Sequence, residues 1–592
     1  MKHNFYLLSL FFLLCGSASF AQESIRRSSA RGTIDEAHIA GQLSHDAYLL
    51  HLLYNITDRT QLDRQFQENI SSVEKCGTST AIKLRDEKNS ASPFVQNEIA
   101  KFLARPSKQK FFDTPGGKLR INYDTTGTHS VYQPTVDINP QNGVPDYVDR
   151  TGEIFDRVWK FEIDTLGYDA PAPDGSAGGG SNRYDIYLHK NSGAYGVTFT
   201  ETFISGYLGR GGWTSYIHVD PAYDGFGYPD RTLPMKVTAA HEFHHAVQFV
   251  YNANAGVWLM EITATWMEDI AYDAINDYYF YLNDGTGMFQ QPHLSLETEN
   301  GAHEYSACLF NHYISENYGV NAVRKIWEET IGAVPAAIAV DSAMASYGTT
   351  LADVYAGYCV WNYFTGNRAN SSHAHYSEAS IYPQTKILRR IIAVPFDSTN
   401  EALPQLQHFG AYNLKIISSH QVGTFELHFD DISGSMYKGK IITDSARNYK
   451  SFNVDLSLGA SIPNWQHIDS IIFIPANVDE AGGGFFFGYS GAFTPSGVTE
   501  NGGVPREFLL KQNFPNPFNP ATILHYALAM ESNVQLTVFN IAGQEIATLL
   551  SEKKPAGEYA IRWEPQGLPS GIYFYKLQTE NFTDVKKMVL MK

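Results

Sequence analysis

Hydrophobic positions change their spacing several times along the chain, and each spacing predicts a different kind of element. From Ile34 to Leu53 the apolar residues recur with a helical period, and a polar region follows up to SASPF. Strand-like runs begin near KLRINYD and return at RYDIYLH and SYIHVD. Helical patterns then dominate from Pro234 to about Tyr358. Strands followed by helices predict an α+β domain, here over residues 106–390.

After ILRRIIAVPF the pattern changes to short alternating runs separated by Gly, Ser, Asp and Asn, which predicts an antiparallel β-sandwich over residues 391–496. The runs are YNLKIIS, TFELHFD, YKGKIIT, FNVDLSL and SIIFIP. The bridge TPSGVTENGGVP leads to a second unit of short strands over residues 507–592. The helical segment before the α+β domain covers residues 22–105, and a pro-region is one interpretation of it.

The first 21 residues have the pattern of a signal peptide. A basic start precedes an apolar run from Phe5 to Leu14, and SASFA supplies small residues up to Ala21. The run is too short to cross a bilayer, and we expect no transmembrane segment elsewhere. We therefore expect cleavage after Ala21 and a soluble exported protein. A lipoprotein would use Cys15, but Leu14 stands where a small residue is needed.

Composition argues against some functions. The 592 residues carry a net charge of −18 without a cluster of Lys or Arg, so we expect no nucleic-acid or anionic-membrane surface. The remaining cysteines, Cys76, Cys308 and Cys359, allow one disulfide and require none. Cys308, in the apolar run YSACLF, is expected to be buried. Cys76 as a thiolate is chemically able to mask a metal, although its neighbours in the sequence give no support for that role.

The stretch DINPQNGVPDYVD has the density of oxygen-bearing side chains found in calcium loops. Its glycine, Gly143, comes one residue too late for the usual D-x-N-x-D-G spacing. A solvated turn is therefore the preferred interpretation, with a Ca²⁺ site as the alternative.

Three histidines and a glutamate lie within five residues in TAAHEFHHAVQF. On a helix, His241 and His245 stand one turn apart on one face with Glu242 beside them, which is the H-E-x-x-H pattern. Pro234 suits the first turn, and NANAG ends the helix. His244, three residues after His241, is expected to support the ligands or to pack rather than to bind metal. The alternative is a histidine-rich core helix, because a chain with 20 histidines shows this pattern by chance in roughly a few per cent of cases.

The next helix, VWLMEITATWMEDIAYD, favours the metal site because it places Glu261, Thr265 and Glu268 on one face. Buried carboxylates are rare unless they are paired or bind metal. Two His and one carboxylate leave a fourth position for water, as in catalytic zinc sites. Zinc would acidify that water and polarise a carbonyl, while Glu242 would take the water's proton and pass it to the leaving amine. The predicted reaction is amide hydrolysis.

HEFHH followed by WLMEITATWMED resembles the gluzincin metallopeptidases, whose second helix carries a W-L-x-E-x-x-A-x-[YW]-x-E type pattern. The matching residues are Trp258, Leu259, Glu261, Ala264, Trp266 and Glu268. The resemblance implies that Glu261 is the third zinc ligand and Glu268 a supporting carboxylate. Gln248 and Tyr251 occupy the Gly and His positions of the metzincin extension, so that extension is absent.

The chain is also similar to a family of secreted bacterial metallopeptidases that share NGVPDYVD, HEFHHAVQF, WMEDIAYDAINDY and YSACLF type blocks, over roughly residues 34–475. These resemblances imply an α+β zincin-like catalytic domain followed by all-β sandwich domains. Gluzincins also place a Tyr or His opposite the Glu to stabilise the oxyanion. GAHEYSACLF offers Tyr305 and His303, and Tyr305 is our candidate.

The C-terminal stretch from Glu507, with FPNPFNP, NIAGQ, LPSGIYFYKL and the terminal KKMVLMK, resembles the type A sorting domain of the type IX secretion system. In physical terms NIAGQ predicts a hairpin turn, and LPSGIYFYKL predicts a turn into an alternating strand. The resemblance implies recognition by the secretion machinery and release outside the cell or at its surface.

Two functions follow from these observations. The first is a secreted zinc endopeptidase that acts on protein or peptide substrates. The second is a non-catalytic surface or adhesion protein on a peptidase-derived scaffold. The complete set of His241, Glu242, His245 and Glu261 favours the first, because a decayed site would be expected to lose at least one of them.

Overall fold

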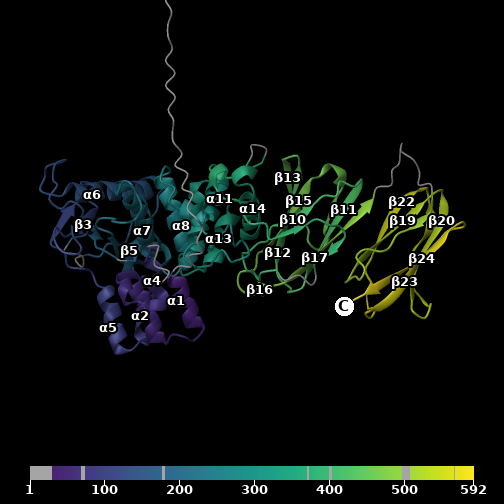
Figure 1. Ribbon diagram of the computed structural model, residues 1–592, viewed down its shortest axis with the longest axis horizontal. Coiled ribbons are helices and arrows are strands. Elements are labelled where there is room, and N and C mark those ends of the chain that lie inside the picture. The colour runs from purple at the N-terminus through teal and green to yellow at the C-terminus, as the bar shows by residue number, and fades with distance from the viewer. Residues whose placement is uncertain are drawn as a thin grey trace, which may run out of the picture. The chain divides into compact units, whose positions relative to one another are not determined.

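The computed structural model describes residues 30–67, 74–175, 181–191, 193–369, 373–398, 403–495, 507–565 and 567–591. The predicted signal peptide and Cys15 lie outside these residues. The chain divides into two compact units: one runs to Gln421 and includes Phe425–Phe493, and the other holds Val422–Thr424 and the residues from Thr494 onward (Figure 1). Each unit has its own hydrophobic core. Within the described ranges, no helix is long and apolar enough to span a membrane.

The first unit begins with a helical segment. The helices α1 (Ala30–Ile39), α2 (His45–Thr57), α4 (Thr78–Glu87) and α5 (Pro93–Phe102) surround a small core that includes Ile34, Leu49, Leu52, Leu84 and Ile99. The single helical pattern predicted for residues 34–53 is two helices, because the chain turns at Gly41, whose φ of 71° suits glycine. The polar region after it also contains a strand, β1 (Glu74–Cys76), which the sequence pattern did not predict.

A six-stranded sheet follows, in the order β1-β5-β6-β4-β3-β2. The predicted strands correspond to β3 (Leu119–Tyr123), β4 (Tyr184–Leu188) and β6 (Gly212–Val219), which are parallel to one another. The strands β2 (Lys110–Asp113) and β5 (Ala194–Ile204) are antiparallel to their neighbours β3 and β6. β1 lies at the edge of the sheet, where it runs parallel to β5.

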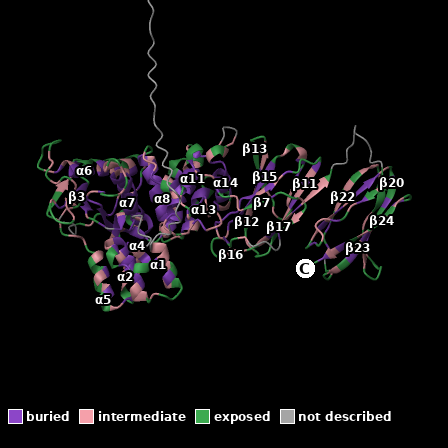
Figure 2. Cartoon of the chain, viewed as in Figure 1, coloured by how far each residue is buried: buried purple, intermediate pink, exposed green. Residues whose placement is uncertain are grey.

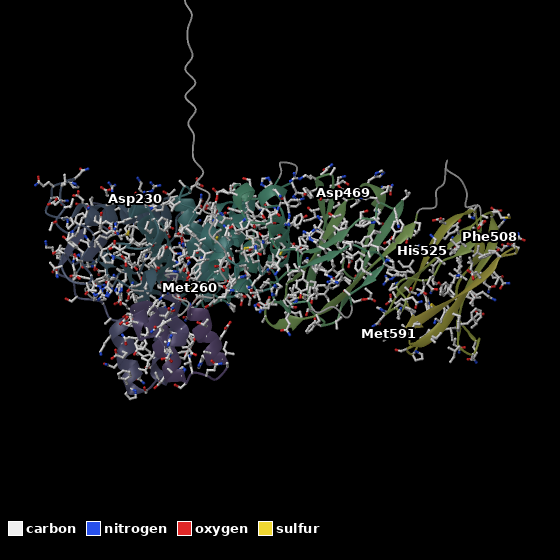
Figure 3. The ribbon with its side chains drawn as sticks, viewed as in Figure 1. Asp230, Met260, Asp469, Phe508, His525 and Met591 are labelled. Carbon is white, nitrogen blue, oxygen red and sulfur yellow. The ribbon has the colours of Figure 1, made fainter. Side chains whose placement is uncertain are left out.

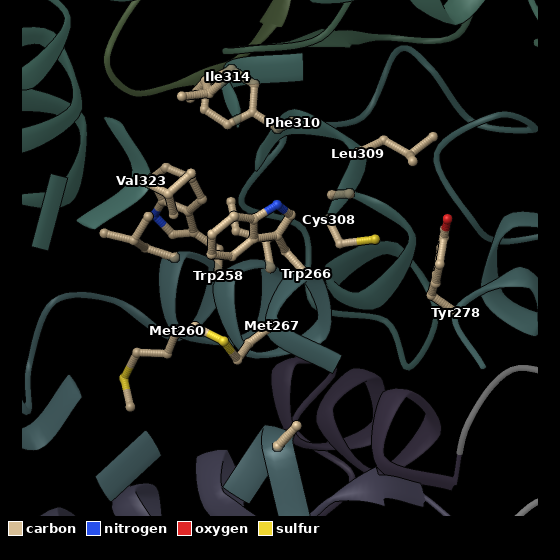
Figure 4. Packing of buried hydrophobic residues seen from close by; sticks show 14 of the residues in the cluster. Trp258, Met260, Trp266, Met267, Tyr278, Cys308, Leu309, Phe310, Ile314 and Val323 are labelled. Carbon is tan, nitrogen blue, oxygen red and sulfur yellow. The ribbon is translucent and has the colours of Figure 1, made fainter. Parts of the chain in front are cut away.

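Helices cover this sheet and form the main core. α6 (Asp146–Trp159) and α7 (Thr232–Asn252) pack against strands of the sheet, and α8 (Val257–Ala271) packs along α7. Figure 2 shows that α7 and α8 are buried over most of their length. The short helix α10 (His303–Ser306) and then α11 (Leu309–Tyr318), α12 (Val320–Glu329), α13 (Ala336–Ala345) and α14 (Leu351–Tyr363) follow. Figure 4 shows Trp258 and Trp266 of α8 packed with Phe310, Ile314 and Val323.

The rest of the first unit is a β-sandwich. One sheet has the order β13-β12-β15-β10-β7 and the other β14-β11-β17-β8, with the short strands β8 (Phe396–Asp397) and β14 (Ala460–Ile462) at its edges. The strands that make up the longest pairings are β10 (Leu414–Ile417), β11 (Gly423–Asp431), β12 (Tyr437–Ser445), β13 (Asn448–Val454), β15 (Ser470–Asn477) and β17 (Phe487–Pro495). The strand β7 (Arg389–Ile391), from the ILRRIIAVPF stretch that precedes the predicted alternating runs, adds a parallel pairing to this sandwich, with β10. Because β12 and β15 pack against α14, Ile442 and Ile472 belong to the same core as the helices.

The second unit is a small sandwich of two antiparallel sheets, β18-β19-β22 and β21-β20-β23-β24. Its strands are β18 (Leu509–Leu510), β19 (Thr522–Leu528), β20 (Ser532–Asn540), β21 (Glu545–Lys554), β22 (Gly557–Trp563), β23 (Gly571–Gln578) and β24 (Thr583–Leu590). Residues from both sheets, among them Leu524 and Tyr575, form the core, and Figure 3 labels Phe508, His525 and Met591 in this unit. NIAGQ forms the turn between β20 and β21, with Gly543 at a φ of 75°.

Candidate metal centre

Side chains from the two packed helices α7 and α8 converge on one point. The helix α7 presents His241 and His245, and α8 presents Glu261. Nε2 of His241 lies 3.2 Å from one carboxylate oxygen of Glu261, and Nε2 of His245 lies 3.7 Å from the other. A fourth donor comes from β1: Sγ of Cys76 lies 3.3 Å from Nε2 of His245. One ligand atom from each of the four residues lies within 4.8 Å of the others.

The local sequence accounts for this convergence. Helical spacing brings His241 and His245 to the same face of α7. The chain then reverses at Gly256, whose φ of 99° suits glycine, so that α8 lies along α7. The apolar side of α8 packs into the core through Leu259 and Trp266, which leaves Glu261 facing the histidines.

The donors fit a zinc ion. Cys76, His241, His245 and Glu261 are each no more than 1% exposed. Burial of a charged carboxylate costs several kcal/mol unless a cation or strong hydrogen bonds compensate for it. Imidazole, thiolate and carboxylate groups are the zinc ligands of proteins, and tetrahedral coordination requires four of them or three and a water. Cys76 therefore lies at the fourth coordination position, which the sequence analysis assigns to a water molecule.

A second layer of contacts orients both histidines. Nδ1 of His241 lies 2.7 Å from Oε1 of Glu268, and Nδ1 of His245 lies 2.8 Å from Oε1 of Gln248. Gln248 in turn donates from Nε2 to the carbonyl oxygen of Met260, a residue labelled in Figure 3. Because each Nδ1 lies beside an oxygen that accepts its hydrogen, Nε2 is the ring nitrogen of each histidine that faces the candidate ligand cluster. The resemblance implies a supporting role for Glu268, whereas nothing in the sequence indicates the contact that Gln248 makes.

Charges close to the ligands shift their pKa values. Burial alone would lower the pKa of His241, but its hydrogen bonds to Glu261 and Glu268 raise the pKa to about 9. Burial lowers the pKa of His245, even though Glu261 is nearby. Burial and the carboxylates of Glu242 and Glu261 raise the pKa of the Cys76 thiol well above its usual value. A metal ion that bound these donors would therefore displace protons.

Glu242 lies beside the ligands without joining them. Its Oε2 accepts hydrogen bonds from Oγ1 of Thr198 at 2.6 Å and from Oγ1 of Thr78 at 3.0 Å. Its Oε1 is buried and has no hydrogen-bond partner among the described residues. The strand β5 passes close by, because a Cβ on Gly196 would lie 2.6 Å from Cγ of Glu242. One carboxylate oxygen is thus held in place while the other is available to accept a proton.

The two candidates for oxyanion stabilisation lie in different surroundings. The ring of Tyr305 lies 6.3 Å from the ring of His241, measured between centroids, and the side chain is buried. His303 instead lines a separate apolar cavity together with Met288 and Leu296. The structure therefore brings Tyr305, and not His303, next to the metal ligands.

His244 points away from the ligands. Its Nδ1 lies 2.7 Å from Oε2 of Glu162, and its ring packs edge-on against Tyr168. This is a buried packing position, one of the two roles that the sequence analysis expects for His244.

The carboxylates of the DINPQNGVPDYVD stretch cap backbone groups. Asp137 accepts from the N–H groups of Asn142 and Gly143 at 2.9 and 2.8 Å. Asp146, the first residue of α6, accepts from the N–H groups of Ile138 and Asn139 at 2.7 and 3.1 Å. These bonds account for the acidic residues as parts of a turn.

The three cysteines that the structure describes, Cys76, Cys308 and Cys359, are buried and free, so the optional disulfide does not form between them.

Several contributors to the site carry no recognisable signal in the sequence. Lys75 forms an ion pair with Glu268, at 2.7 Å between Nζ and Oε2, and another with Asp277. Thr78 and Thr198 contact Glu242 from two separate segments. Threonines and a lysine at such positions are common in any chain, and only the pairing of β1 with β5 brings them to the centre.

Comparisons with known proteins cover parts of the chain. Residues 227–406 match a family of unknown function (DUF6055), a range that contains α7, α8 and α10 but not Cys76. No curated protein matches the sequence. Among solved structures, a β-1,2-glucanase from Parabacteroides distasonis is 8% identical with a TM-score of 0.15, and the alignment covers 32% of each chain. The Endo-D glycoside hydrolase domain Spr0440 from Streptococcus pneumoniae R6 is 10% identical with a TM-score of 0.14, over 42% of this chain and 52% of that one.

This chain spans about a third and about half of the lengths of those two structures, and likenesses at such TM-scores carry no argument about fold or activity. The C-terminal match is informative. Residues 512–591, within the second unit, match the secretion system C-terminal sorting domain. The chain therefore carries a type IX secretion sorting domain, which directs the protein to the cell surface or the extracellular space.

Proposed function

We propose that the protein is a secreted zinc-dependent metallopeptidase, most simply an endopeptidase, with a gluzincin-like, zincin-like centre on α7 and α8. One observation carries the proposal. The ligand atoms of His241, His245 and Glu261 converge, while Glu242 of the same helix stays outside the ligand set with one oxygen uncommitted. A purely structural metal site has no need of a buried carboxylate that is neither a ligand nor fully paired.

Each residue has a distinct role in this proposal. His241, His245 and Glu261 would hold the zinc, and Glu268 and Gln248 would orient the two imidazoles. When bound, zinc acidifies a water and polarises the carbonyl of the scissile amide. Oε1 of Glu242 would accept the water's proton and deliver it to the leaving amine, while Thr198 holds Oε2 in place.

The hydroxyl of Tyr305 would donate a hydrogen bond to the oxyanion that develops on the carbonyl oxygen. Its ring lies beside His241 and packs against Tyr281, with 4.7 Å between centroids, which restricts its orientation.

The test separates chemistry from metal binding by comparing two substitutions in α7, on protein collected from the medium of a secreting host. Glu242→Gln should keep zinc and thermal midpoint but lose about 10²-fold or more in casein turnover, because base catalysis contributes about 10²–10⁴-fold. His245→Ala should lose zinc and activity together.

Glu162→Gln is the matched control. It makes the same isosteric change at another buried glutamate that contacts α7, through His244, and should leave zinc content and turnover unchanged. Full activity in Glu242→Gln, or a zinc-free parent that still digests casein, would contradict the mechanism.

One observation favours the second candidate, a non-catalytic surface or adhesion protein. Cys76 completes a set of four protein donors, and closed sets of four are typical of structural zinc sites. In that case the secreted parent binds zinc but cleaves no peptide, whether or not the N-terminal segment has been removed by limited proteolysis, and Glu242→Gln is indistinguishable from it.

A further inference from the structure

The strand that carries Cys76 lies across the metal centre as an added edge strand. β1 pairs with β5 in parallel, with Glu74 opposite Ala194 and Cys76 opposite Gly196. The N–H of Glu74 donates to the carbonyl oxygen of Gly193 at 2.8 Å, and the N–H of Gly77 donates to that of Gly196 at 2.9 Å. Extended peptides bind proteins in this way, by adding a strand to a sheet edge.

Three residues of this short stretch contact three residues of the centre. Lys75 pairs with Glu268, which orients His241. The thiol of Cys76 lies among the ligand atoms, and the hydroxyl of Thr78 donates to Glu242. A ligand position, the proposed base and the supporting carboxylate are therefore all contacted from β1 and from the first residue of α4, Thr78.

We propose that the N-terminal segment, residues 30–103, is a built-in inhibitor of the peptidase. This inference rests on the proposed function. Cys76 supplies a thiolate as the fourth zinc ligand, and β1 occupies the sheet edge on which an extended substrate would bind. Two further observations support a metal at this point. Three other donors surround the thiol, and Oε1 of Glu242 beside them has no hydrogen-bond partner among the described residues.

The segment is built as a separable piece. Its helices enclose their own core, distinct from the main core of the unit. Polar contacts fix it to the rest: Arg31 pairs with Glu299 at 3.0 Å, and Arg59 donates to the carbonyl oxygen of Gly193 at 3.1 Å. A smaller shared cluster, which includes Ile56 and Val197, adds an apolar contact.

The connection that follows the segment is suited to cleavage. Ala104 is exposed, whereas Arg105 is anchored to Asp185 and Asp174 at 2.6 Å each. Hydrolysis of a peptide bond near Ala104 consumes one water and needs no oxidant or reductant. The thiolate of Cys76 would leave with the segment and take up a proton, and the arginine would stay with the sheet.

Cobalt(II) substituted for zinc tests the ligand directly, since a thiolate bound to cobalt(II) gives a near-ultraviolet charge-transfer band. The intact chain should show this band at one cobalt per chain. Cys76→Ser should bind cobalt without the band. Cys359→Ser, the matched control at another buried cysteine, should keep the band.

Removal of the segment gives a second measurement that needs no substitution. Limited proteolysis of the intact chain, with the cut mapped near Ala104 by mass spectrometry, should abolish the cobalt band. In the zinc form it should raise casein turnover at least about tenfold, as expected if the segment blocks at least about 90% of the molecules.

The outcomes separate this inference from the proposed function. A chain that binds cobalt through His241, His245 and Glu261 but shows no thiolate band overturns the role of Cys76 and leaves the peptidase intact. A band that disappears on cleavage without any gain in turnover supports Cys76 as a ligand but overturns the inhibitor, and it counts against the peptidase as well. A chain that binds no metal overturns both.

Discussion

At the level of single residues, the centre depends on side chains that do not touch the metal position. Glu268 illustrates this, because one of its oxygens accepts from Nδ1 of His241 while the other pairs with Lys75. Loss of Glu268 would free the imidazole to rotate and would leave Lys75 with Asp277 alone. Loss of Glu261 would remove a donor from the ligand set itself.

The loss of zinc affinity caused by substitutions along one face of α8 should therefore follow what each side chain contacts in the candidate site. We expect Glu268→Ala to lower zinc affinity about 10- to 100-fold, as changes in residues that orient a ligand do. Glu261→Ala should lower zinc affinity more strongly. Thr265→Ala, between the two on the same face, removes a buried hydroxyl that has no hydrogen-bond partner among the described residues and should leave affinity unchanged. Competition with a chromophoric chelator measures all three, and a Glu268→Ala chain that holds no zinc at all would mean that Glu268 is the ligand.

The spacing of residues within a helix was predictable from the sequence, and contacts between distant segments were not. Helix geometry alone places His241 and His245 on one face, and the same period places Glu261 and Glu268 together. Cys76 reaches the same point through the pairing of a three-residue strand with β5. Such a pairing leaves no periodic pattern in the sequence, because its partner lies far along the chain.

At the level of elements, the pairing of β1 with β5 places Cys76 among the candidate ligands. The loop before β5 receives contacts from both sides of the N-terminal segment. Gly193 donates to the carbonyl oxygen of Ile56 at the end of α2 and accepts from Glu74 and Arg59. The approach is close, since a Cβ on Gly193 would lie 1.8 Å from the carbonyl oxygen of Asn55. Only glycine fits between α2 and β1 without a backbone shift.

Gly193→Ala should accordingly loosen the N-terminal segment. Overpacking of this kind costs about 1–3 kcal/mol, which would raise the population of the displaced segment roughly 5- to 150-fold. Cleavage near Ala104 follows that population when opening is fast, so limited proteolysis should accelerate by a similar factor. Gly206→Ala is the control, because a Cβ at this position in the turn after β5 would meet no atom of the described part of the chain within 4 Å. Equal cleavage rates in both variants would mean that this contact does not hold the segment.

At the level of the whole molecule, the two units differ in how their cores are built. The core of the first unit runs from Leu119 to Val478, so the helices and the sandwich that follows them share buried residues. The sequence pattern assigned these regions to separate parts, because a change of periodicity marks a change of element type and carries no information on which faces pack together. The core of the second unit draws only on residues between Leu510 and Leu590.

Removal of the second unit should therefore affect export and not folding. Deletion of Glu507–Lys592 takes away the sorting domain together with a core to which the first unit contributes no residue. We expect the truncated chain to pass the inner membrane, to fold with an unchanged thermal midpoint for the first unit and to accumulate in the periplasm. Cell fractionation with a periplasmic marker, compared with the full chain carrying the same affinity tag, measures this. Release of the truncated chain into the medium, as for the full chain, would show that export does not depend on the second unit. Degradation or aggregation of the truncated chain in the periplasm would show that the first unit needs the second unit to fold.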